Sequence, residues 1–252
     1  MKDLIRKFIG FKELFFPSWE ERQLEKKRFE FYGQFISRGD LVFDVGANMG
    51  NRTKIFLQLG AKVVAIEPQK KCCTFLKLRF GRKVIIIPKG LGEKEDKKLF
   101  YIADISVLSS FSEEFIKSTN QSGRFKQYKW NKSEYVDITT LDLLIKEYGI
   151  PRFIKIDVEG YELEVLKGLS YLINYVSFEY AVPELITNTI DCIKQIEGIF
   201  GNTTLFNYSA RESMEFALDV WLPFDKMIDY IFSQDFENTG FGDIYAHIFD
   251  KY

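Results

Sequence analysis

Short apolar, β-branched runs alternate with helix-like segments from residue 40 onward, and this alternation constrains the fold more than any other feature. The first three runs are residues 41–45, 62–66 and 84–87. Such runs are typical of parallel strands buried on both faces, and repeated strand–helix units predict a doubly wound sheet. We therefore expect an α/β, Rossmann-like fold with a mainly parallel sheet and an antiparallel final strand near residues 243–249.

The first 36 residues follow a different pattern, so we divide the chain into an N-terminal helical arm, residues 1–36, and a Rossmann-like domain, residues 37–252. Ser18 and Glu21 have the spacing of a capping box at the start of a helix. The arm is expected to pack on the domain or to cover the substrate as a lid, because its mixed charges disfavour a membrane surface. One face of its first segment is apolar: Leu4, Ile5, Phe8 and Ile9.

The composition is that of a globular protein with a large core, since 46% of the 252 residues are hydrophobic and 25 are Phe. Lys and Arg total 35 against 36 Asp and Glu, and this balance disfavours nucleic acid as the main partner. Three cysteines form neither a disulfide framework nor a zinc motif. With no signal-peptide pattern and no run of about 18 apolar residues, the chain is interpreted as cytoplasmic, without a transmembrane segment. No feature indicates an oligomeric state.

The stretch "LVFDVGANMG", residues 41–50, leads from the first strand into two glycines, Gly46 and Gly50. The nicotinamide fingerprint requires G-x-G-x-x-G, so this loop is a poor cradle for a pyrophosphate. It suits a smaller zwitterion, such as the methionine end of S-adenosylmethionine, with Asp44 and Asn48 as polar partners. A tight structural turn is the alternative interpretation.

An acidic residue follows the second strand in "AIEPQ", residues 65–69. Glu67 lies 21 residues beyond Gly46, about where an acid binds ribose hydroxyls in these folds. We include the next residue, Pro68, among the expected cofactor contacts. The glycine loop and this acid together predict a nucleoside-cofactor site at the carboxyl ends of the strands.

The second unusual stretch is "FIKIDVEGYELEVLKGL", residues 153–169. Inner parallel strands are apolar on both faces, yet Lys155 and Asp157 lie two apart on one face. Buried charges persist only when they are paired or used in function. Asp157 is therefore a candidate functional residue.

These stretches resemble the FkbM-type S-adenosylmethionine-dependent methyltransferases. "VFDVGANMG" is similar to that family's cofactor loop, and residues 153–169 are similar to its second signature. "VDITTLD" and "GDIYAHI" also fit, so the resemblance covers about residues 40–250 and leaves out the arm. It implies an O-methyltransferase for a hydroxyl of a sugar, glycan or secondary metabolite. It also implies that Glu67 binds the ribose, and that Gly90 in "IPKGLG" flanks the adenine.

Methyl transfer to a hydroxyl requires a positioned acceptor and a group that takes its proton. Asp157 is the leading candidate, with Glu159, Glu179 and Lys155 as further catalytic candidates. In a purely structural role, Asp157 would pair with Lys155 or cap the helix that begins near Gly160. Carboxylates could also hold Mg²⁺, but no tight acidic cluster is visible along the chain, so no metal site is predicted. The single histidine, His247, is expected to be structural.

A second function that the residues could support is that of an RNA ribose 2′-O-methyltransferase, whose catalytic set could be Lys155, Asp157 and Glu179. "RFKQYKWNK", residues 124–132, interleaves bases with aromatics as single-strand binders do, whereas the balanced net charge argues against it. A nicotinamide oxidoreductase and a cofactor-binding protein without catalysis are also compatible with the fold. The mostly polar residues 104–134 are expected to form a long functional loop that borders the acceptor pocket.

Overall fold

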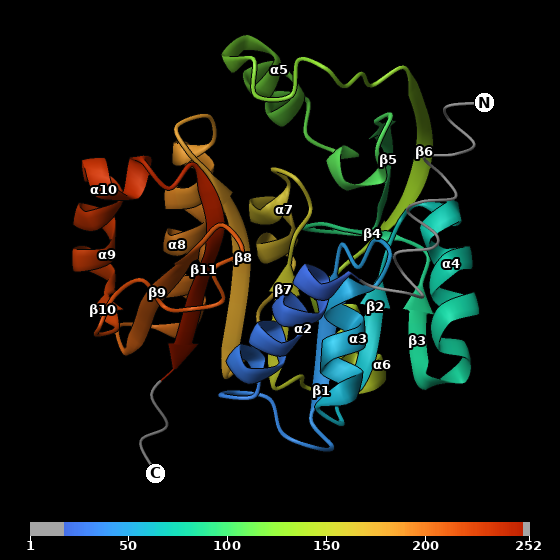
Figure 1. The fold of residues 1–252 in the computed structure, drawn as a ribbon, viewed down its shortest axis with the longest axis horizontal. Helices are drawn as coiled ribbons and strands as arrows, with labels where there is room; N and C mark the ends of the chain where they lie inside the picture. The colour runs from blue at the N-terminus through green and yellow to red at the C-terminus, as the bar shows by residue number, and fades with distance from the viewer. Residues whose placement is uncertain (1–17, 249–252) are drawn as a thin grey trace.

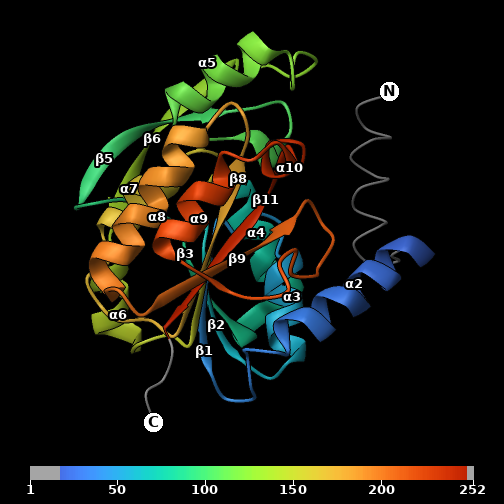
Figure 2. The same cartoon turned by 90° about the vertical axis from the view of Figure 1, so that its left-hand side faces the viewer.

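The computed structural model describes residues 18–248. The apolar face predicted within the first segment of the arm lies outside the described residues. Within the described range, helices pack on both faces of one large sheet, and a smaller sheet stands above one end of it (Figures 1 and 2).

The large sheet confirms the predicted doubly wound, mainly parallel architecture. Its strands lie in the order β10-β9-β11-β8-β7-β1-β2-β3. The run from β3 to β8 is parallel, whereas β11 is antiparallel to both of its neighbours, β8 and β9. The strands are β1 (Leu41–Val45), β2 (Lys62–Ile66), β3 (Val84–Ile87), β7 (Phe153–Ile156), β8 (Tyr175–Ala181), β9 (Thr204–Ala210), β10 (Leu222–Pro223) and β11 (Phe241–Ile248).

Strand alternation divides the core into two layers. Neighbouring residues of β1 show this, because Val42 packs in one apolar cluster and Phe43 in the other. The first cluster lies under α2 (Trp19–Tyr32), α3 (Asn51–Gln58) and α4 (Lys70–Phe80). The second lies under α6 (Leu141–Tyr148), α7 (Glu162–Lys167), α8 (Ile186–Phe200), α9 (Phe224–Ile231) and α10 (Gln234–Glu237).

The arm helix α2 is packed on the domain. The Ser18 hydroxyl accepts a hydrogen bond from the Glu21 amide at 3.2 Å, which confirms the predicted N-cap. Phe31 and Tyr32 are buried, and the Tyr32 ring meets that of Phe56 on α3 at 5.0 Å. These contacts account for the apolar spacing of this helix, and a lid function for residues 1–36 stays a prediction.

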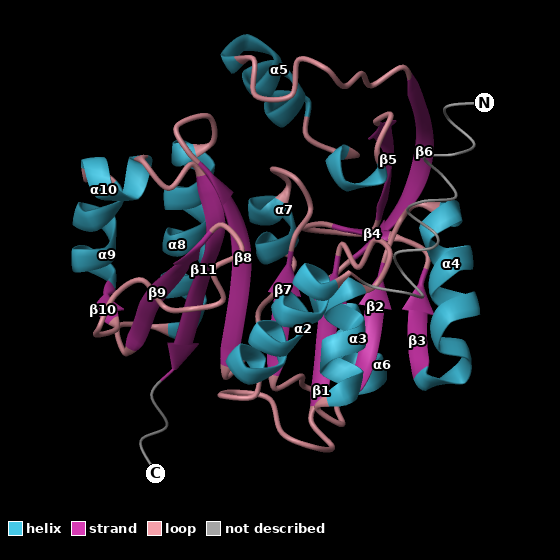
Figure 3. Cartoon of the chain, in the orientation of Figure 1, coloured by secondary structure: helices cyan, strands magenta, loops and turns pink. Residues whose placement is uncertain are grey.

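The expectation of a long loop over residues 104–134 is wrong. The segment holds a 3-10 turn, η2 (Ser106–Leu108), and helix α5 (Glu113–Ser122), and it ends inside strand β6 (Lys132–Thr139). The segment connects two strands of a three-stranded sheet. The strand order of this sheet is β4 (Gly90–Leu91), β6, β5 (Asp96–Ile102). Figure 3 shows α5 and its flanking loops above the large sheet. We call residues 103–131 the cap segment.

Candidate active site

The glycine loop and the second signature meet at one edge of the large sheet, as predicted. Gly46 follows β1 with φ +80°, and a Cβ atom there would lie 1.8 Å from the Asp157 carbonyl oxygen. Glycine is needed at position 46 because the neighbouring backbone comes so close, and β1–β7 pairing holds that backbone alongside.

A cavity of about 380 Å³ opens at this edge. Its walls come from the ends of β1, β2, β3 and β7, and from the cap segment. Its size falls in the range of small-molecule sites. Five of the seven predicted cofactor residues line it, namely Gly46, Asn48, Glu67, Pro68 and Gly90.

The other two predicted cofactor residues lie outside the lining of this first cavity. Asp44 is buried and accepts a short hydrogen bond from the Thr53 hydroxyl of α3, and burial raises the pKa of Asp44 to about 6. Gly50 is the N-cap of α3 with φ +78°, and a Cβ there would lie 2.5 Å from the Phe80 ring. Both residues therefore stabilise the glycine loop without lining the cavity.

Glu67 connects the glycine loop to the end of β2. Its two carboxylate oxygens accept hydrogen bonds from the backbone amides of Asn48 and Gln69, each at 2.8 Å. Burial raises the pKa of this carboxyl to about 7, although the two amide donors act in the opposite direction. Glu67 is thus a fixed, buried carboxyl group at the cavity wall.

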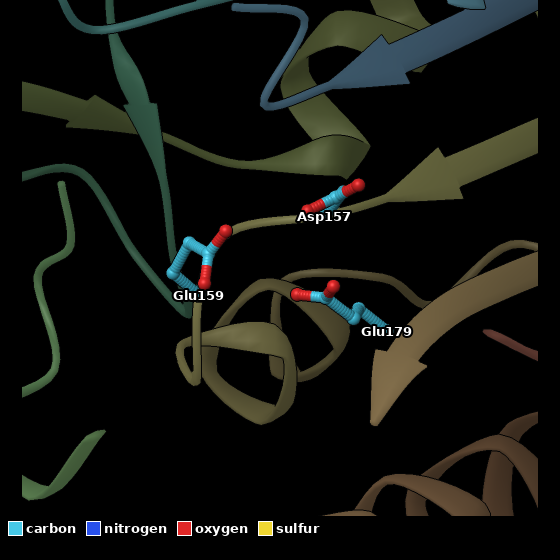
Figure 4. A group of neighbouring side chains, drawn as sticks. All are labelled: Asp157, Glu159 and Glu179. Carbon is cyan, nitrogen blue, oxygen red and sulfur yellow. The ribbon is translucent and has the colours of Figure 1, made fainter. Parts of the chain in front are cut away.

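Three carboxylates meet where the first cavity borders a second one (Figure 4). They belong to Asp157 after β7, Glu159 in the following turn, and Glu179 near the end of β8, and one oxygen of each lies within 4.8 Å of the others. Burial, and then the charge of Asp157, raises the pKa of Glu159 and of Glu179 well above its usual value. The expectation that the chain holds no tight acidic cluster is therefore wrong.

Lys155 lies beneath this cluster and does not line either cavity. Its side chain is fully buried, and its ammonium donates to Asp243 at 2.8 Å and to Asp157 at 3.3 Å. The predicted Lys155–Asp157 pair is present. The alternative, in which Asp157 caps α7, is not found, because the N-cap position is Tyr161 and no side chain accepts from the first amides of the helix. Glu162 accepts from the amides of Val158 and Gly160 in the turn before it.

Sequence analysis missed Asp243, the second carboxylate on Lys155. It is the one acid of the final strand β11 and is buried, so an internal cation is needed to account for it. His247, in the same strand, stacks on Tyr175 with ring centroids 5.1 Å apart and lines neither cavity, in agreement with the structural role expected for it.

A family model described as the methyltransferase FkbM domain matches residues 44–237, which span both signatures and most of the sheet. The chain belongs to this family. It is an S-adenosylmethionine-dependent methyltransferase, and the resemblance stated from its two signatures is confirmed. No curated protein sequence matches it.

Solved structures similar to this FkbM methyltransferase have low sequence identity to it. A putative rRNA methylase from Clostridium thermocellum has a TM-score of 0.44 and 10% identity, over 87% of this chain and 92% of that one. A TehB-like methyltransferase from Corynebacterium glutamicum has a TM-score of 0.44 and 9% identity, over 88% and 87%. The plantazolicin methyltransferase BpumL, solved with S-adenosylhomocysteine, has a TM-score of 0.43 and 11% identity, over 96% and 89%.

The donor set of the first cavity fits the cofactor that this family uses. Each carboxylate oxygen has two lone pairs, so the oxygens of Glu67 can accept from ribose hydroxyls in addition to their amide donors. Phe100 and Phe111 line the cavity beside Gly90, where a Cβ would lie 2.6 Å from the Phe111 ring. These flat apolar walls suit an adenine.

No helix between residues 18 and 248 combines the length and apolarity needed to cross a membrane.

Proposed function

We propose that this FkbM methyltransferase binds S-adenosylmethionine in the first cavity and methylates a hydroxyl of a sugar, glycan or secondary metabolite. The methionine part is assigned to Gly46 and Asn48, the ribose to Glu67 and Pro68, and the adenine to the wall at Gly90. When bound, the cofactor supplies an electrophilic methyl group on its sulfonium.

The observation that carries the proposal is the place of Asp157. It lines the first cavity next to the glycine loop, and its side chain is 35% exposed. Lys155 donates to Oδ2 from below, which leaves Oδ1 able to accept a proton from the acceptor hydroxyl. A hydroxyl has a high pKa, so a fixed carboxylate that orients or takes its proton assists attack on the methyl group.

A second candidate acceptor, an RNA ribose 2′-hydroxyl, has less support. The aromatics of residues 124–132 are used in packing: Trp130 donates to the Leu108 carbonyl at 2.7 Å, and Phe125 packs against the Phe115 ring. Lys155 is buried beneath the cavity, where it cannot reach a nucleic acid phosphate. The aromatics of residues 124–132 therefore do not form the stacking platform that single-strand binders use, so the exposed cations of this stretch, Lys126, Lys129 and Lys132, stand without one.

Asp157→Asn tests the proposal, because it preserves shape and removes the basic oxygen. Single-turnover methyl transfer to a panel of glycans and metabolites should slow by about 10²–10⁴-fold, with little change in cofactor affinity by calorimetry. Asp219→Asn, at an exposed position outside both cavities, is the matched control. If the variant instead loses cofactor affinity but transfers normally when saturated, Asp157 is a cofactor ligand and the base lies at Glu159 or Glu179.

A further inference from the structure

We propose that the second cavity binds the methyl acceptor and selects an uncharged, largely apolar molecule that presents a hydroxyl group. This inference rests on the proposed function of the first cavity. The second cavity measures about 310 Å³, and its apolar walls include Leu108, Phe115, Phe125, Leu185 and Phe241.

The location of the second cavity suits an acceptor. Glu159, Glu179 and Phe241 line both cavities, so the two spaces meet at the carboxylate cluster. Asp157, the proposed base, has an oxygen within 4.8 Å of the other two carboxylates. A molecule that fills the second cavity can therefore present a hydroxyl to Asp157 while the cofactor occupies the first.

The charged groups around the second cavity leave no cation for an anionic acceptor. Among its described lining residues Arg124 is the one cation. Its guanidinium donates to the carbonyls of Val182 and Gly240 at 3.0 and 2.8 Å, and it pairs with Glu184 at 3.3 Å. These contacts attach the cap segment to the edge of β8 and β11, so Arg124 is committed to structure.

The carboxyl groups that face the acceptor are Glu159 and Glu179. The third acid of the lining, Glu162, accepts from two backbone amides and from the Asn188 amide. Burial, and then the charge of nearby Asp157, raises the pKa of both Glu159 and Glu179, so they keep a proton to higher pH than ordinary glutamates. A protonated glutamate beside an ionised carboxylate of this cluster offers one donor and one acceptor.

This donor and acceptor match a hydroxyl, which both donates and accepts hydrogen bonds. An ammonium group only donates, so it fits only after both glutamates ionise, which burial and the charge of Asp157 oppose. A carboxylate or phosphate would meet like charge with no counter-ion, which is a costly arrangement away from water. The pocket chemistry therefore favours an uncharged alcohol over either charged class.

Three probes of one shape test this selectivity: 3-phenylpropan-1-ol, 3-phenylpropan-1-amine and 3-phenylpropanoate. Each is titrated by ligand-observed NMR into protein saturated with S-adenosylhomocysteine at pH 7.5. The alcohol should bind with a dissociation constant of about millimolar, as expected for a fragment of about ten heavy atoms. The carboxylate should bind at least about tenfold more weakly, and the amine no more tightly than the alcohol.

Ala181→Phe tests the location, because Ala181 lines only the second cavity. It should weaken alcohol binding at least about tenfold with S-adenosylhomocysteine affinity unchanged. Ala210→Phe, on β9 at the same sheet edge and outside both cavities, is the matched control. If Ala181→Phe lowers the melting temperature sharply, Phe125→Ala replaces it, since removing a wall should also weaken the alcohol.

Several outcomes would overturn the inference: no binding of the alcohol to saturated protein, equal binding of the carboxylate, tighter binding of the amine, or unchanged alcohol binding in the cavity variants. Failure of the protein to bind S-adenosylhomocysteine at all would instead count against the proposed function of the first cavity. The two failures are thus separate readouts of one experiment.

Discussion

Both cavities are lined by Glu159 and Glu179 of the carboxylate cluster, but most of their other lining residues come from different elements of the fold. The first takes most of its lining from loops that directly follow four strands of the large sheet, and Glu67 accepts from two backbone amides there, while the cap segment adds Ser106, Val107, Ser109 and Phe111. The second takes its apolar wall from the cap segment, through Leu108, Phe115 and Phe125. In the proposed function the cofactor contacts mainly the sheet edge, whereas the acceptor contacts more of the cap segment, and loops of this kind can vary on a constant scaffold.

Gly46→Val should have the largest effect on the first cavity. A Cβ at Gly46 would overlap the Asp157 carbonyl, and β1–β7 pairing prevents the two strands from moving apart. We expect binding of S-adenosylhomocysteine to be lost, with unfolding destabilised by about 3–5 kcal/mol. Thermal melting and calorimetry measure both effects. Gly198→Val is the control, because a Cβ at that position in α8 meets no atom within 4 Å. Normal binding by Gly46→Val would show that the loop can relax.

The same contrast explains what could be predicted from sequence. The glycine loop, Glu67 and the second signature each follow an apolar strand, so local patterns revealed both the fold and the wall of the first cavity. Helix α5 was missed because its polar sequence carries only Phe115 and Ile116 as large apolar residues. The available signals were at its ends: N-cap Ser112, the first-turn acids Glu113 and Glu114, and C-cap Gly123.

The carboxylate cluster depends on long-range geometry that no local pattern carries. Glu159 and Glu179 lie twenty positions apart, and β7–β8 pairing brings their strands together. Glu159 also has φ +55°, a left-handed conformation that is unusual for a residue other than glycine, and it changes the direction of the chain after Asp157. Asp243 reaches Lys155 across 88 positions.

Lys155→Met tests the buried ion pairs beneath the junction of the two cavities. The substitution keeps length but leaves Asp243 buried without its cation, which should lower the free energy of unfolding by about 3–5 kcal/mol. Urea denaturation measures this change. Lys194→Met is the control, since Lys194 pairs with Asp191 on the surface and should contribute no more than about 1 kcal/mol. Equal destabilisation by the two variants would remove Lys155 as the counter-ion of the buried acids.

The smallest expected effect is a pH dependence confined to the first cavity. Burial raises the pKa of Glu67 to about 7, so its ionised fraction falls as the pH decreases from 8 to 6. An ionised carboxylate accepts ribose hydroxyls more strongly than a protonated carboxyl, because charge-assisted hydrogen bonds are the stronger kind. Affinity for S-adenosylhomocysteine should therefore fall with decreasing pH, by at most about tenfold over this range. Titration calorimetry at constant ionic strength measures the slope.

Glu67→Gln separates this slope from that of the neighbouring acid. The amide cannot ionise, so affinity should be lower at pH 8 and nearly constant down to about pH 7, below which Asp44, whose pKa burial raises to about 6, takes up a proton. Alcohol-probe binding in the second cavity should not follow the Glu67 slope, because Glu67 lines only the first cavity. A wild-type affinity that stays constant between pH 8 and 6 would remove the Glu67 carboxylate from the ribose site. A slope that persists unchanged in Glu67→Gln would assign it to another acid, and the candidates are Glu159 and Glu179 at the junction and Glu162, whose pKa is raised by burial to about 7.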